Sequence, residues 1–74
     1  MKYTNEINTM IERNIIEKGN ITVSVLFNES NDCILIYTAK NGYFYISFVG
    51  TKNHMVFSSY EKAISAANKY GYHN

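Results

Sequence analysis

The chain has 74 residues and a formal net charge of +1, with acidic and basic residues mixed along its length. This balance argues against a strong nucleic-acid binder, which needs clustered lysine and arginine, and equally against an acidic mimic of DNA. A chain of this length has room for one hydrophobic core, so we expect residues 1–74 to form a single domain. Cys33 is the only cysteine, so an internal disulfide is excluded and self-association or a partner is the remaining aid to stability.

The sequence carries no apolar run long enough for a membrane helix, and its first residues lack the basic-then-apolar pattern of a signal peptide. We therefore expect a cytoplasmic protein, in the host cell if the chain is phage-encoded, with no membrane contact.

Residues 4–18 are predicted to form the first helix, with Gly19 as its stop signal. Its apolar residues recur at helical spacing and would form one buried stripe, namely Ile7, Met10, Ile11 and Ile15.

Four strands are predicted next, over residues 21–27, 33–39, 43–49 and 54–57, separated by turn sequences. A second helix follows Ser58, which with Glu61 has the spacing of a capping box, and Gly71 ends it. The order α-β-β-β-β-α predicts an α+β fold. We expect a four-stranded antiparallel meander sheet, flanked by the N- and C-terminal helices, with both helices on one face.

The Asn41-Gly42 pair indicates a β-hairpin with a two-residue type I′ loop. That loop pairs Thr38 with Tyr45 and Ile36 with Ser47. One face of the hairpin then carries the bulk that the helices need, in Cys33, Leu35, Tyr37, Phe44, Ile46 and Phe48.

The opposite face of the hairpin is also apolar and aromatic in this register, and exposed apolar patches usually mark interaction sites. Tyrosine is enriched in interfaces because it combines a large apolar body with a polar tip. The predicted partner-binding residues are Ile34, Ile36, Lys40, Tyr43, Tyr45, Val49, His54 and Val56. The alternative is that one helix packs on each face, which leaves nothing exposed.

The sequence shows no pattern of residues that is typical of a catalytic site. Neither His54 nor His73 has a carboxylate at a useful spacing, and Cys33 has no basic neighbour to stabilise a thiolate. No phosphate-binding glycine loop and no metal-ligand spacing occurs. We therefore expect no enzyme, no cofactor and no metal site.

The segment from Gly42 to Phe48, GYFYISF, resembles the RNP1 signature of the RNA-recognition motif over this one strand. The resemblance implies that Tyr43 and Tyr45 stack on bases. Asn41 replaces the basic residue that begins the motif, Phe44 replaces a small residue, and no strand precedes the first helix. These departures favour an ordinary aromatic strand.

The function predicted from these patterns is that of a small protein-binding module that is not an enzyme. In general character, as a small chain with little cysteine and no catalytic residues, it resembles phage-encoded inhibitors of host defence, including anti-CRISPR proteins. That resemblance implies occlusion of a host complex through the open sheet face. The alternatives are a weak single-stranded RNA or DNA binder using Lys40, Tyr43, Tyr45 and His54, and a homodimer that buries the outer face.

Overall fold

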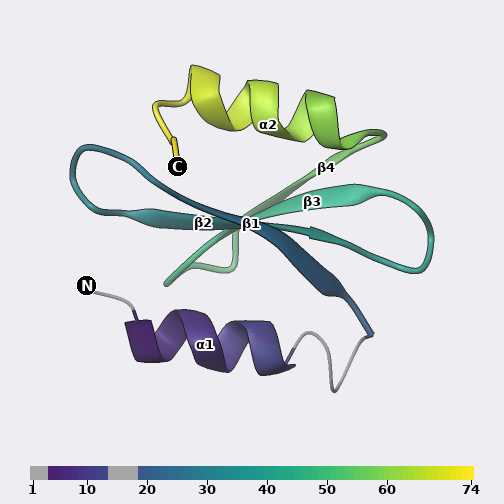
Figure 1. The fold of residues 1–74 in the computed structure, drawn as a ribbon, viewed down its shortest axis with the longest axis horizontal. Coiled ribbons are helices and arrows are strands. Elements are labelled where there is room, and N and C mark those ends of the chain that lie inside the picture. Colours follow the sequence, from purple (N-terminus) through teal and green to yellow (C-terminus); the bar gives the residue numbers. More distant parts are fainter. Residues whose placement is uncertain (1–3, 14–18) are drawn as a thin grey trace.

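The computed structural model describes residues 4–13 and 19–74 (Figure 1). Its elements are α1 (Thr4–Arg13), β1 (Ile21–Phe27), β2 (Cys33–Thr38), β3 (Phe44–Phe48), β4 (His54–Phe57) and α2 (Tyr60–Lys69). The strands form one antiparallel sheet in the order β1-β2-β3-β4. The predicted α+β class and element order are confirmed. The last part of the predicted first helix, residues 14–18, lies outside the described residues.

The two helices lie on opposite faces of the sheet, with α1 below it and α2 above it in Figure 1. The prediction that both helices share one face is therefore wrong, and the alternative of one helix on each face is correct. The physical reason lies in β2, where the four residues from Cys33 to Ile36 are all buried. Successive side chains of a strand point to opposite faces, so a run of buried residues needs a cover on both sides.

The β2–β3 hairpin has a three-residue loop, Lys40 to Gly42, in place of the predicted two-residue loop. The Ala39 N–H donates to the Tyr43 carbonyl at 3.3 Å, and the Gly42 N–H donates to the Ala39 carbonyl at 3.0 Å. Gly42 has a φ of +84°, whereas Asn41 does not have a positive φ. A type I′ turn needs positive φ at both central residues, so this loop is instead a type I turn closed by a glycine bulge.

The extra loop residue shifts the strand register by one position. Thr38 pairs with Phe44 and Tyr37 with Tyr45, whereas the two-residue loop predicts Thr38 opposite Tyr45. Because side chains alternate between faces, a slip of one residue exchanges the faces of β2 relative to β3. The predicted division of the hairpin into a core face and an outer face is therefore wrong for β2.

Two clusters of buried side chains result, one on each face. On the face toward α2, here called the α2-side face, the strands contribute Leu26, Ile34, Ile36 and Ile46, which pack against Ala63 and Ala67 of α2. On the opposite face, the α1-side face, Cys33, Leu35 and Val49 pack against Ile7 of α1.

Helix α2 begins one residue later than the capping-box spacing predicts. Ser59 is the N-cap, and its hydroxyl accepts a hydrogen bond from the Lys62 N–H at 3.2 Å. After the helix, Gly71 adopts a φ of +92° and the Tyr72 N–H donates to the Ala67 carbonyl, which is the pattern of a Schellman motif. This turn carries the chain back to the sheet.

No helix within residues 4–13 and 19–74 has the length and apolar character needed to cross a membrane.

Candidate functional site

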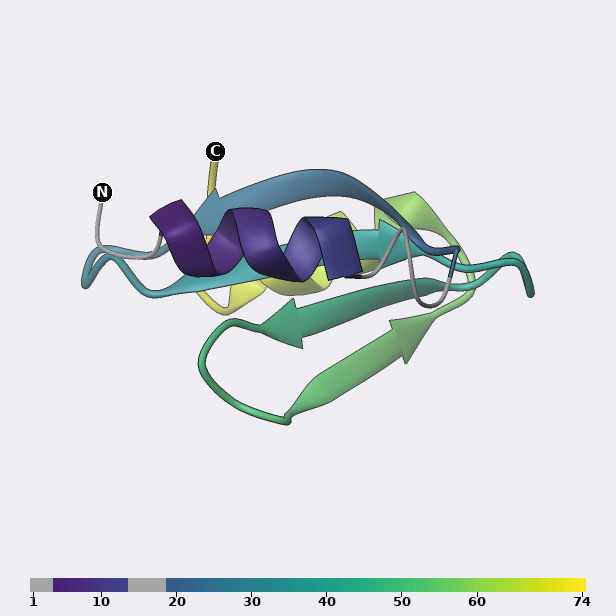
Figure 2. The ribbon, with the colours of Figure 1, turned by 90° about the horizontal axis from the view of Figure 1, so that it is seen from below.

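Helix α1 covers only part of the face on which it lies. Viewed from below, α1 runs over β1 and β2, while β3 and β4 extend beyond it (Figure 2). The contacts are consistent with this view, because the strand side chains that pack against the cluster around Ile7 include Val25 and Phe27 of β1. The part of the α1-side face formed by β3 and β4 is therefore open.

Two stacked tyrosines, one from β2 and one from β3, lie at the border between the covered and the open part. Tyr37 and Tyr45 face each other across β2 and β3, and their rings stack with centroids 5.2 Å apart and planes 10° from parallel. The Tyr45 hydroxyl accepts a hydrogen bond of 2.8 Å from Asn41 Nδ2. Burial raises the pKa of the Tyr37 hydroxyl above its usual value, and the neighbouring Tyr45 raises it further. The pair forms an aromatic wall with polar tips.

A groove of about 370 Å³ lies between this wall and α1. Its described lining comprises Met10, Arg13, Tyr37, Tyr45, Ser47, Thr51, Lys52, Asn53 and His54. Two of these residues are cations, and no aspartate or glutamate is among the described residues that line the groove. Glu12, beside Arg13 in the chain, is exposed but is not part of this lining. The groove therefore combines an aromatic wall with local positive charge in a chain of almost neutral charge.

Strand β4 forms the outer border of the groove. Val56 pairs with Tyr45 and His54 pairs with Ser47, so both side chains lie on the α1-side face. Both are exposed, and Val56 retains 55% of its accessible surface. An exposed valine at the edge of a sheet adds apolar surface next to the tyrosine wall.

The structure divides the predicted partner-binding residues among several environments. Ile34 and Ile36 are completely buried under α2, and Val49 is buried on the α1-side face. The prediction that these three are exposed is wrong, because it follows from the incorrect register and from the expected placement of both helices.

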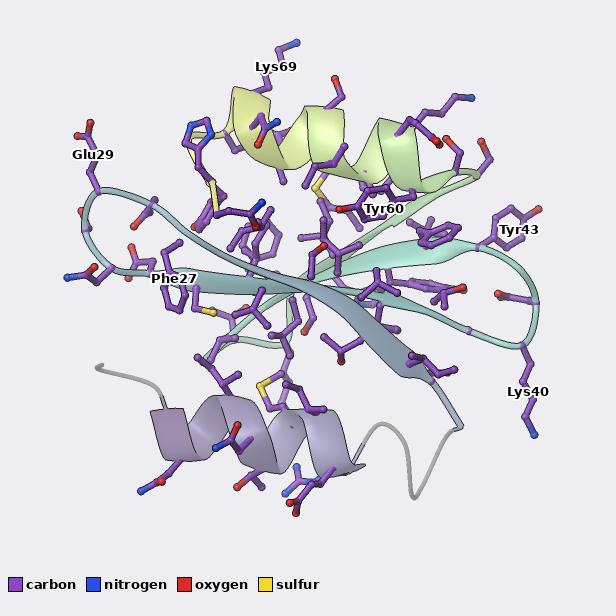
Figure 3. The ribbon with its side chains drawn as sticks, viewed as in Figure 1. Phe27, Glu29, Lys40, Tyr43, Tyr60 and Lys69 are labelled. Carbon is purple, nitrogen blue, oxygen red and sulfur yellow. The ribbon has the colours of Figure 1, made fainter. Side chains whose placement is uncertain are left out.

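Lys40 lies in the hairpin loop and Tyr43 directly follows it. Their side chains point in opposite directions, Lys40 toward the α1 side and Tyr43 toward the α2 side (Figure 3). Tyr43 is 48% exposed and does not line the groove. The implied RNP1-like pair of Tyr43 and Tyr45 on one face is therefore not formed. Of the predicted set, Tyr45 and His54 line the groove and Val56 borders it.

Sequence reasoning missed Tyr37, Arg13 and Lys52. A three-residue loop, with Gly42 as a bulge, places Tyr37 opposite Tyr45, and Gly42 is compatible with either loop. Arg13 and Lys52 come from α1 and from the β3–β4 turn, and no spacing in the sequence connects them. They are brought together only by the placement of α1.

Cys33 lies in the α1-side cluster and is 2% exposed. Burial raises the pKa of its thiol to about 11, which disfavours the reactive thiolate at neutral pH. Within residues 4–13 and 19–74, no cluster of His, Cys, Asp and Glu has the arrangement of a metal site.

No family model matches the chain, and no curated protein or solved structure is significantly similar to it.

Proposed function

We propose that this chain is a small, non-enzymatic protein-binding domain, and that its partner occupies the groove between α1 and the β3–β4 part of the sheet. The observation that carries the proposal is the stacked pair Tyr37 and Tyr45, which is only partly buried in a small protein whose other sheet face is packed under α2. Aromatic walls bordered by arginine are typical of binding surfaces, where tyrosine and arginine contribute much of the binding energy.

Occlusion is the mode of action that this proposal favours. A domain with extents of 32 × 27 × 19 Å is large enough to obstruct a site on a bigger assembly. Inhibition of a host defence complex by a phage-encoded protein of the anti-CRISPR type stays the more specific prediction within the proposal. We place the action in the cytoplasm, where single unpaired cysteines such as Cys33 are common.

The test uses the full chain as immobilised bait in a lysate of the cell in which it is expressed. Tyr45→Ala removes half of the aromatic wall, whereas Tyr43→Ala removes an exposed tyrosine outside the groove and serves as the matched control. We expect the captured partner to be lost with Tyr45→Ala and retained with Tyr43→Ala, with both variants folded by circular dichroism. Equal capture by all three proteins would refute the proposal.

Single-stranded nucleic acid is the second candidate, and the positions of Arg13 and Lys52 beside the tyrosines favour it. The mutual stacking of Tyr37 and Tyr45 speaks against it, because it occupies ring faces that bases would need. The salt dependence of binding distinguishes nucleic-acid binding from protein binding. Binding of an oligonucleotide weakens steeply as salt rises, and a protein contact with two cations does so far less.

Self-association through the same groove is the third candidate. Sedimentation at increasing protein concentration tests it directly. If a dimer forms and Tyr45→Ala dissociates it, the occupant of the groove is a second copy of this chain and not a different protein.

A further inference from the structure

The two edges of the sheet are treated differently in this fold. At the β1 edge, the C-terminal segment pairs with Phe27, whose N–H and carbonyl both bond to His73 at 2.9 Å. The same strand is interrupted by a register shift between Thr22 and Ser24. Covering segments and bulges are the usual devices that keep a sheet edge from pairing with another chain.

The β4 edge carries neither device. Its register with β3 is regular from His54 to Phe57, and the strand HMVF contains no proline, lysine, arginine or acidic residue. No described segment pairs with its outer side, since β4 is the last strand of the sheet. Such an edge is a template for an additional strand.

The backbone groups that β4 presents outward can be assigned. The Phe48 N–H donates to the Asn53 carbonyl at 3.2 Å, so these two residues form a hydrogen-bonded pair. Bonded and non-bonded pairs alternate in an antiparallel ladder, so Met55 and Phe57 also bond to β3. The N–H and carbonyl groups of His54 and Val56 therefore point away from the sheet.

The side chains of His54 and Val56 lie on the groove side, so a strand added beside them would extend the α1-side face. Every second side chain of that strand would lie on the same side of the sheet as the groove, next to its β4 border. There it would meet Arg13 and Lys52, with no acidic partner among the described lining residues. Aspartate or glutamate at alternate positions matches this charge.

A second copy of this chain would not supply that charge. Its β4 is preceded by Lys52 and contains no carboxylate, and its β1, ITVSVLF, is uncharged. Charge complementarity therefore favours a segment of a different protein over self-pairing.

We infer that the partner contributes an extended acidic segment that pairs with the outer edge of β4 as a fifth strand, and that its alternate carboxylates contact Arg13 and Lys52. This inference rests on the proposed function and specifies how the partner enters the groove. Backbone hydrogen bonds supply affinity in this mode, and the alternate side chains supply specificity.

The experiment selects binders from a display library of random short peptides against the full chain. We expect the selected peptides to carry Asp or Glu at every second position, with β-branched residues between them. Val56→Pro removes an outward N–H without breaking a bond to β3, and we expect it to weaken binding about tenfold or more. Val56→Thr keeps the N–H and is the matched control, and we expect it to weaken binding less than Val56→Pro does.

A second measurement keeps the inference testable should Val56→Pro fail to fold. In the unmodified protein, the bound peptide should protect the His54 and Val56 amides from hydrogen exchange. Peptides that bind in a Tyr45-dependent way, without this protection, would overturn strand addition and leave the proposed function intact. Three results would overturn the inference that an acidic segment pairs with β4. They are a library that yields no binder, binders without acidic residues, and a self-dimer that Val56→Pro dissociates.

Discussion

The two faces of the sheet differ in how completely a helix covers them. On the α2-side face, isoleucines from β2 and β3 pack against the small residues Ala63 and Ala67, which let the helix approach closely. On the α1-side face, α1 packs over β1 and β2 through Ile7 and leaves the tyrosines of β2 and β3 partly exposed. We infer that the first face mainly stabilises the fold, whereas the second combines a smaller core with a binding groove.

The largest effect should come from the α2-side face. Ile46 is completely buried there, so Ile46→Ala removes apolar contacts and leaves a cavity in the core. We expect the free energy of unfolding to fall by about 3 kcal/mol. Val56→Ala, at an exposed position on the other face, is the control and should change stability by less than about 0.5 kcal/mol. Urea denaturation measures both, and similar losses would contradict the division between the faces.

Ile7→Ala tests the cover on the α1-side face. Ile7 is 6% exposed, and we expect a loss of about 2 kcal/mol, at the lower end for such a truncation. Cys33 lies in the same cluster and reports its opening through the rate of thiol alkylation. If α1 detaches locally, Ile7→Ala should accelerate alkylation more than Ile46→Ala does, although Ile46→Ala destabilises the protein more. If the alkylation rate of Cys33 instead rises in proportion to the loss of unfolding free energy in each variant, α1 and the sheet open together.

Gly42→Ala tests the loop that sets the register between the faces. Apart from Gly42 and its two chain neighbours, no residue has an atom within 4 Å of the position that a Cβ would take, so the change introduces no clash. The φ of +84° is still unfavourable for alanine, and we expect a loss of about 1 kcal/mol. Gly50→Ala, also at an open position with a φ of +87°, should behave alike. No loss at Gly42 would indicate that the loop relaxes to another turn.

The sequence was sufficient to predict the elements because their signals are local. Alternation and turn residues located β1 and β4 with the bounds that the structure has, and helical spacing located the stripe that includes Ile7. The assignment of residues to the two faces failed because it depends on whether the hairpin loop has two or three residues. Asn41-Gly42 is compatible with both loop lengths. The groove was missed for a different reason, since Arg13 and Lys52 line one groove only through the tertiary placement of α1.

The smallest effects on stability are expected from the removal of one tyrosine hydroxyl on each face of the sheet. On the α2 side, the Tyr60 hydroxyl shares a part-buried hydrogen bond of 2.8 Å with the Ser24 hydroxyl, so Tyr60→Phe leaves Ser24 without that partner. We expect a loss of about 1 kcal/mol. Tyr45→Phe removes the exposed bond to Asn41 and preserves the stacking on Tyr37, so water can replace the lost partner. A loss of a few tenths of a kcal/mol is expected there. Thermal unfolding of both variants measures the difference, and a larger loss at Tyr45 would mean that the open face is more tightly packed than the groove implies.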